Sequence, residues 1–427
     1  MDRQPILFNP FPQEISMSRL FTAVLLFLSV SVVSAQETKD WNQWKGPKSD
    51  NHSFCTGLID SIPEGGPKLL WQVDTLGGGF SNLCFSGDQI FTLGDFGDKC
   101  FVLALDRKTG KENWRTPIGR SGGNAGHNGP FGTPACDGET VYVMSQFAEF
   151  AALDVKNGNI RWQKNTEREL GGRRMAGWSF SMSPLLDGDK IILPIGGDGG
   201  TLAAFDKSGN LLWRSEELKD AAAYTSAVPV EIGGVRQYLL LTGQSIVAIS
   251  AADGKILWGA NFPGRTAVCS DPVLVGDVVM ASCGYGVGAV FYRITKEGDT
   301  FKAFDFNGDQ SLQSHHGGIV AVGDHCYFMS NSRRIICVEA KTGKMVWENQ
   351  GVGKGSMLYA DGKLFLRSES GDGTVAMIEA TPTGYKELGR FDQPDRSDKS
   401  SWTYPLIVDG KLFLRDQGLL LCYDVKK

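Results

Sequence analysis

Short segments in which apolar and polar residues alternate run through most of the chain, and glycine-rich turns separate them. Clear examples are Thr140 to Ser145, Ile191 to Ile195 and Lys363 to Arg367, each of which follows an Asp-Gly turn. A period of two is the pattern of a β-strand with one buried face, and Asp-Gly is typical of tight turns between antiparallel strands. The pattern therefore predicts an all-β protein built from hairpins.

A longer pattern, Ala-x-Asp-x-x-x-Gly-x-x-x-Trp, recurs along these strands. Weak copies lead to Phe304 and Leu388, and the better copies together with an N-terminal tryptophan end at Trp71, Trp114, Trp162, Trp213, Trp258 and Trp347. Successive end positions are 41 to 51 residues apart. Such a step is the length of a four-stranded propeller blade. We therefore expect each tryptophan to fill the space between two neighbouring blades, with the Asp and Gly holding the turn between the third and fourth strands.

The two ends of the chain are expected to complete one sheet. Ser401 to Ile407, Lys411 to Asp416 and Gly418 to Val425 read as three strands without a fourth, and Lys68 to Val73 supplies the missing one. Closure of this kind leaves no free sheet edge. We predict an eight-bladed β-propeller of four-stranded antiparallel blades over residues 68–427, closed by the N- and C-terminal strands.

The N-terminal region carries the one long apolar run, Leu20 to Val33, which follows Arg19 and is followed by small residues up to Ala35. This run is typical of a secretory signal peptide, so residues 1–35 are expected to be removed on export to the periplasm or outside the cell. Met17 is an alternative start, and a retained anchor helix is the alternative to cleavage. Residues 36–67 are expected to form a strap on the propeller, and no integral membrane segment is predicted after the signal is removed.

Charge and cysteine content exclude some classes of function. The formal net charge of −5 gives no field that attracts a polyanion, so nucleic acid is not an expected partner. The nine cysteines include no CxxC pair and no CxxCH site, and we predict no metal site. Cys269 and Cys283 lie nearly opposite each other on a predicted hairpin, so they are either a disulfide or two buried thiols.

The repeats resemble the tryptophan-docking repeat of the PQQ (pyrroloquinoline quinone) propeller family, which includes quinoprotein alcohol dehydrogenases and BamB. The resemblance covers roughly residues 68–427. Within the family the chain is similar to exported single-domain PQQ-binding-like propellers, and the segments that carry this likeness are Trp41 to Pro47, Gly65 to Trp71, His315 to Gly318, Gly353 to Ser356 and Phe391 to Ser397.

In such a propeller the connections from the fourth strand (D) of one blade to the first strand (A) of the next surround the mouth of a central funnel. Four of these D–A connections are long and polar: Ile118 to Phe131, Gln163 to Phe180, Asp305 to Gly318 and Gly389 to Trp402. Loops at such a mouth commonly bind ligands. Our candidate ligand-binding residues are His127, Arg173, Arg174, Trp178, His315, His316 and Trp402.

The resemblance also implies an enzymatic alternative. Quinoprotein dehydrogenases use PQQ with calcium, a catalytic Asp, an Arg on the quinone and a Trp under its ring, and many carry a disulfide between adjacent cysteines. This chain has no adjacent cysteine pair and no CxxCH haem site. We therefore predict a scaffold that binds a small molecule or a protein at the funnel mouth and assign neither catalytic residues nor a cofactor; a PQQ-dependent or related oxidoreductase is the alternative.

Overall fold

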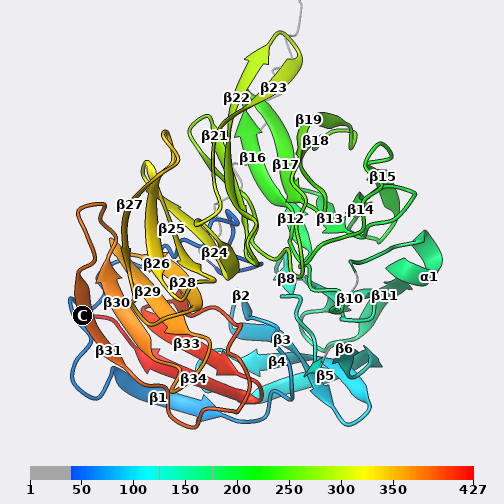
Figure 1. Cartoon of the computed structure of the whole chain (residues 1–427). Coiled ribbons are helices and arrows are strands. Elements are labelled where there is room, and N and C mark those ends of the chain that lie inside the picture. Colours follow the sequence, from blue (N-terminus) through cyan, green and yellow to red (C-terminus); the bar gives the residue numbers. More distant parts are fainter. Residues whose placement is uncertain (1–39, 125, 176) are drawn as a thin grey trace, which may run out of the picture. The chain divides into compact units, whose positions relative to one another are not determined.

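The computed structural model describes residues 40–124, 126–175 and 177–427, which lie in one compact unit that spans Thr38–Lys427. This part of the chain forms eight four-stranded antiparallel sheets and one two-stranded sheet. The eight sheets follow one another around a ring, so the predicted eight-bladed β-propeller is confirmed (Figure 1). The predicted signal peptide lies outside the described residues.

The blades are numbered here in chain order, and each runs from its inner strand A to its outer strand D. Blade 1 consists of β2 (Cys84–Ser86), β3 (Gln89–Phe96), β4 (Lys99–Asp106) and β5 (Glu112–Arg120), and blade 2 of β8 (Ala135–Cys136), β9 (Thr140–Met144), β10 (Glu149–Asp154) and β11 (Ile160–Asn165). Blade 3 consists of β12 (Leu185–Asp187), β13 (Lys190–Pro194), β14 (Leu202–Asp206) and β15 (Leu211–Arg214), and blade 4 of β16 (Val228–Ile232), β17 (Val235–Leu241), β18 (Ser245–Ser250) and β19 (Ile256–Asn261). Blade 5 consists of β20 (Val273–Val275), β21 (Val278–Cys283), β22 (Gly288–Glu297) and β23 (Thr300–Asp309), and blade 6 of β24 (Ser314–Val322), β25 (His325–Ser330), β26 (Ile335–Glu339) and β27 (Lys344–Asn349). Blade 7 consists of β28 (Gly355–Ala360), β29 (Lys363–Ser368), β30 (Val375–Glu379) and β31 (Glu387–Phe391), and blade 8 of β32 (Leu406–Val408), β33 (Lys411–Asp416), β34 (Leu419–Asp424) and β1 (Lys68–Val73).

The ring closes in blade 8, where the two ends of the propeller meet. Strand β1 pairs antiparallel with β34, and Trp71 stands opposite Cys422. The pairing gives the last three strands the partner that they lack in sequence order, as predicted. Blade 8 therefore joins the N-terminal strand to the three C-terminal strands and leaves no gap in the ring.

The repeated tryptophans lie between blades. Trp114 on blade 1 packs against Gly158 in the C–D turn of blade 2, where a Cβ atom would come within 2.4 Å of the indole. Its Nε1 donates to the carbonyl of Val155 in the same turn, at 3.0 Å. The same tryptophan–glycine contact joins three further pairs: Trp71 and Gly110, Trp162 and Gly209, and Trp213 and Gly254. The turn must carry glycine because the indole occupies the space of a side chain.

Blade 5 departs from the expected repeat. Phe304 does not occupy the docking place that we assigned to it; it is 52% exposed on β23. Asn307 stands there instead, because it pairs with Phe291 next to the bulge and its Nδ2 donates to the carbonyl of Thr342 at 3.1 Å. The hairpin β22–β23 is longer than its counterparts, and it projects beyond its neighbours in Figure 1. The added length shifts the register of the motif by three residues.

Two of the expected connections contain secondary structure that we did not predict. A two-stranded hairpin of β6 (Gly123–Asn124) and β7 (His127–Asn128) lies between blades 1 and 2. A short helix, α1 (Thr166–Leu170), follows β11. The connection between β23 and β24 is shorter than expected because both strands extend into it. The two histidines at positions 315 and 316 lie near the start of strand A of blade 6, as expected.

The predicted strap spans residues 36–67, of which 36–39 lie outside the described residues. The segment from Asp40 to Leu58, which alone we call the strap from here on, contacts the inner strands around the ring. Its hydrogen bonds reach six of the eight A strands, at Phe85, Cys136, Leu186, Ala321, Tyr359 and Ile407. All six residues are the last or the last but one of their strand, at the end that leads to the A–B turn. The strap therefore approaches the central channel from the side opposite the D–A connections.

Within the described residues, no helix has the length and apolar character needed to span a bilayer. The core is divided among the blades and their interfaces, where the alternating strands place one apolar face against each neighbour.

Candidate functional site

The D–A connections meet around a cavity of about 130 Å³ at one end of the channel. Its wall is aromatic for the most part and is lined by Trp44, Phe80, Phe131, Trp178, Ser181, Tyr224, Ala267, Cys269, Tyr285, His315, His316, Trp402 and Tyr404. The connections at six of the eight blade junctions contribute at least one of these residues, and strand A of blade 6 contributes His315 and His316. A site of this kind exists only when the ring is closed.

Hydrogen bonds between neighbouring D–A connections hold these connections in place. The backbone N–H of Thr133 donates to the hydroxyl of Ser183 on the next blade, and the N–H of Ser183 donates to Ser226 in the same way, both at 2.9 Å. The N–H of Ser226 then donates to Asp271 Oδ1, also at 2.9 Å. This chain links blades 2 to 5 at the level where the cavity wall begins.

The strap contributes part of the wall and is anchored by an ion pair. Lys45 Nζ lies 2.8 Å from Asp271 Oδ2, and both side chains are almost fully buried. The same carboxylate accepts the indole N–H of Trp44 at 2.9 Å, and the Trp44 ring packs 4.8 Å from that of Tyr404. Because Asp271 receives donors from the strap and from blade 4, it locks the strap to the inner wall.

Two adjacent histidines form the most polar part of the wall. His315 Nδ1 and His316 Nδ1 are 3.0 Å apart, and Glu369 Oε2 lies 3.4 Å from His316 Nδ1. Burial lowers the pKa of both imidazoles to about 3; the neighbouring His316 adds to the shift for His315, and Lys354 adds to it for both. Both rings are therefore neutral at physiological pH.

The Nε2 atoms of both histidines are buried without a hydrogen-bond partner among the described residues, and so is the indole nitrogen of Trp178. Buried polar atoms are normally paired, because an unmade hydrogen bond costs about 1–3 kcal/mol. All three belong to side chains of the cavity wall. The packing around the three nitrogens leaves almost no accessible surface on any of them.

The loop between β31 and β32, residues 392–405, carries Trp402 into the cavity. Trp402 Nε1 donates to Glu369 Oε2 at 3.2 Å, and its ring lies 4.7 Å from the rings of both Phe80 and His127. The backbone N–H of Ser401 donates to the carbonyl of Glu369 at 2.8 Å. Trp402 and Glu369 are thus held as a pair.

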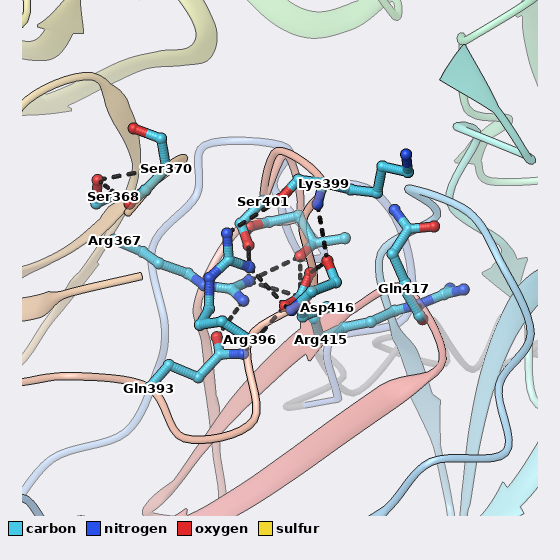
Figure 2. A network of polar contacts seen from close by, with 12 residues as sticks. Arg367, Ser368, Ser370, Gln393, Arg396, Lys399, Ser401, Arg415, Asp416 and Gln417 are labelled. Carbon is cyan, nitrogen blue, oxygen red and sulfur yellow. Dashed lines mark hydrogen bonds and ion pairs between the residues drawn. The ribbon is translucent and has the colours of Figure 1, made fainter. Parts of the chain in front are cut away.

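A buried polar network beneath this loop sets its position (Figure 2). Asp416 forms an ion pair with Arg396 at 2.5 Å and accepts the N–H and hydroxyl of Ser397 at 2.7 and 2.8 Å. Arg367, which is fully buried, donates to the carbonyl of Thr403 at 3.2 Å and to Gln393. Four of these residues belong to the loop or flank it, so the network fixes the loop at both ends.

The same network joins blades at the closure of the ring. Arg367 on β29 donates to the carbonyl of Arg415 on blade 8 at 2.7 Å, and Arg415 on β33 donates to the carbonyl of Ser81, next to blade 1, at 2.7 Å. Both arginines end the same five-residue sequence, Lys-Leu-Phe-Leu-Arg, in consecutive blades. Each one therefore reaches across to the blade that follows it.

The structure brings five of the seven sequence-predicted ligand-binding residues together. Trp178, His315, His316 and Trp402 line the cavity, and His127 stands at its edge against Trp402. The other two predicted residues do not line the cavity. Arg173, with 54% of its side chain exposed, donates to the carbonyl of Lys219, and Arg174 donates to the carbonyl of Trp178 at 3.2 Å.

Sequence reasoning missed most of the aromatic wall. Phe80, Phe131, Tyr224 and Tyr404 each precede strand A of a blade by a few residues and are followed by a small or turn-forming residue. That recurrence at blade spacing was a usable signal. Glu369 carried no such signal, because it lies in a B–C turn and reaches the histidines only through the fold.

The polar groups of the cavity do not fit calcium with PQQ. Calcium takes six to eight oxygen ligands, whereas the acidic groups beside this wall are engaged: Asp271 binds Lys45, and Glu369 binds Lys354 and Trp402. Among the described residues, no group of three or more His, Cys, Asp and Glu side chains is arranged to hold a metal ion. Cys269 and Cys283 are free thiols, and both contact the carbonyl of Ala267.

Comparisons with known proteins agree with this architecture. A family model described as outer membrane protein assembly factor BamB matches residues 98–314 and 299–387. The protein of that name from Moranella endobia (strain PCIT) is 23% identical over 300 residues, which cover 66% of this chain and 71% of that protein.

Two solved structures share the fold. BamB from Moraxella catarrhalis, at 15% identity, has a TM-score of 0.53 and covers 78% of this chain and 93% of that one. Quinohemoprotein alcohol dehydrogenase ADHIIG from Pseudomonas putida HK5, at 13% identity, has a TM-score of 0.60 and covers 91% of this chain and 80% of that one. At these identities the two structures establish the architecture and leave the activity open.

Proposed function

Since this chain belongs to the PQQ-repeat family of the outer membrane protein assembly factor BamB, we propose that it is an exported interaction scaffold that binds its ligand or partner at the mouth of the propeller. The observation that carries the proposal is the aromatic cavity formed by connections from six blade junctions.

A periplasmic or extracellular location is part of this proposal. It is supported by the apolar run before Ala35, which is typical of a signal peptide, and by the name of the related protein, an assembly factor for outer membrane proteins. Cell fractionation with N-terminal sequencing tests it directly. We expect a mature chain that begins after Ala35, and a full-length chain in the cytoplasm would contradict export.

Site-specific photo-cross-linking in cells tests the use of the mouth. A photoreactive amino acid is placed at His127, at the edge of the cavity, and in a control variant at Leu212, which is 47% exposed on the outer strand β15. We expect specific adducts from the first position and fewer from the second. Equal labelling at both positions, or labelling at Leu212 alone, would place the interaction on the outer rim and contradict the proposal.

The oxidoreductase alternative is tested with the same purified protein. PQQ and calcium are added, and both the quinone absorbance and alcohol-dependent dye reduction are followed. Because the acidic groups beside the cavity are already paired, we expect neither a spectral change nor turnover. Turnover with an alcohol would replace the scaffold by the enzyme.

A further inference from the structure

Two cysteines of blade 5 stand at the cavity and contact the same backbone oxygen. Cys269 lies in the D–A connection that leads to β20 and lines the cavity, where it is partly exposed. Cys283 is the last residue of β21 and is buried. Their Sγ atoms lie 3.8 and 3.5 Å from the carbonyl oxygen of Ala267. The two thiols therefore converge on one point from separate segments of the chain.

A second pair of cysteines on neighbouring strands lacks this geometry. Cys326 lies on β25 and Cys337 on β26, but the residues opposite them are Val338 and Tyr327. Positions that are one residue out of register point to opposite faces of a sheet, so these two thiols cannot meet. Among the cysteines that the structure describes, Cys269 alone lines the cavity.

Burial determines when this pair can react. It raises the pKa of both thiols, and the neighbouring Cys283 raises the pKa of Cys269 further. Because the thiolate is the reactive form in disulfide exchange, the folded pair reacts slowly. A bond between the two sulfurs therefore has to form while the chain folds. Compartments outside the cytoplasm are oxidising, and disulfides form and persist there.

We propose that Cys269 and Cys283 form a disulfide when the chain folds in an oxidising compartment. The inference rests on the proposed export and adds a covalent modification to the cavity wall. One S–S bond replaces two S–H bonds, and the two hydrogens with their electrons pass to the disulfide of a thiol–disulfide oxidoreductase, which becomes a dithiol. The bond ties the wall segment to β21, two residues before Asp271, to which the strap is anchored.

Alkylation followed by tryptic mapping of the whole mature chain tests the bond. Residues 266–293 form one tryptic peptide, which ends at Arg293 and contains Cys269 and Cys283 as its only cysteines. The chain is isolated from outside the cytoplasm, denatured and alkylated without prior reduction. We expect this peptide to carry no alkyl group and to be lighter than the dithiol form by two hydrogens. After reduction it should take up two alkyl groups.

Two variants show which sulfurs are joined. In Cys269→Ser the peptide should be alkylated once without reduction, at Cys283. Cys326→Ser, a matched control whose change lies in a different tryptic peptide, should leave residues 266–293 oxidised. A bond from either sulfur to any other cysteine would overturn the inference.

Refolding of the purified chain in reduced and oxidised glutathione separates this inference from the proposed export. A mature chain that begins after Ala35 but takes up two alkyl groups on residues 266–293 without reduction would overturn the disulfide and leave export standing. A full-length chain in the cytoplasm would remove the proposed export, and the refolded chain then decides: an oxidised peptide supports the pairing, and two free thiols overturn it.

Discussion

Replacing Asp416 by Asn should release the loop that carries Trp402. Asp416 is almost fully buried, and its carboxylate forms an ion pair with Arg396 and accepts the backbone N–H of Ser397. Asparagine keeps the shape of the side chain but removes its charge, which leaves Arg396 buried beside Arg367 without a counter-ion. Removing one partner of a buried pair costs about 3–5 kcal/mol, and we expect about 3 kcal/mol because 10% of the Arg396 side chain is exposed.

Hydrogen exchange followed by mass spectrometry measures this cost locally. Peptides from residues 392–405 should exchange on the order of a hundredfold faster in Asp416→Asn, the factor that corresponds to about 3 kcal/mol. The urea midpoint should fall as well. Asp424→Asn, at an exposed carboxylate in the same sheet, is the matched control and should change stability by less than about 0.5 kcal/mol.

The double variant Asp416→Asn with Arg396→Met separates charge from packing. If the loss comes from an unpaired arginine, removing that arginine should recover part of the stability. Native-like exchange in the single variant would refute the reasoning, because the loop would then be held without the ion pair.

Three further predictions concern other parts of the propeller. Burial lowers the pKa of the two cavity histidines from 6.5 to about 3, so the unfolded chain binds more protons than the folded chain between these pH values. Stability that is present above about pH 6.5 should therefore be lost as the pH falls toward 3. Urea midpoints measured over this pH range should show the loss, and His316→Gln should make it smaller. Gly158→Ala should cost at least about 1–3 kcal/mol in thermal unfolding because its Cβ would strike the docking indole, whereas Gly138→Ala, also at positive φ but with open space, should cost less. Asp271→Asn should lower the free energy of unfolding by about 3–5 kcal/mol, because it leaves Lys45 buried and unpaired. A matching loss of stability in Lys45→Met, with no coupling between the two changes in the double variant, would contradict the ion pair.

The architecture could be predicted because its signals are local and repeated. Alternation of apolar and polar residues identifies a strand from a few neighbours, and the tryptophan motif repeats at blade spacing, so errors in single copies average out. The three unpaired C-terminal strands and the N-terminal Lys68–Val73 strand then required closure by both ends. Phe304 shows the limit of this reasoning, because a longer hairpin shifted the docking position to Asn307 without leaving a mark in the repeat.

The site depended on tertiary structure to a greater degree. The sequence by itself determined that the D–A connections meet at one mouth, which was enough to bring Trp178, His315, His316 and Trp402 to the cavity wall. It did not determine that Arg173 would lie outside that wall, nor that Glu369 would stand beside His316. The reason is physical: strand pairing follows from neighbours in the chain, whereas the direction of a loop side chain follows from contacts with residues far away in sequence. Only the closed ring, with its strap and buried network, supplies those contacts.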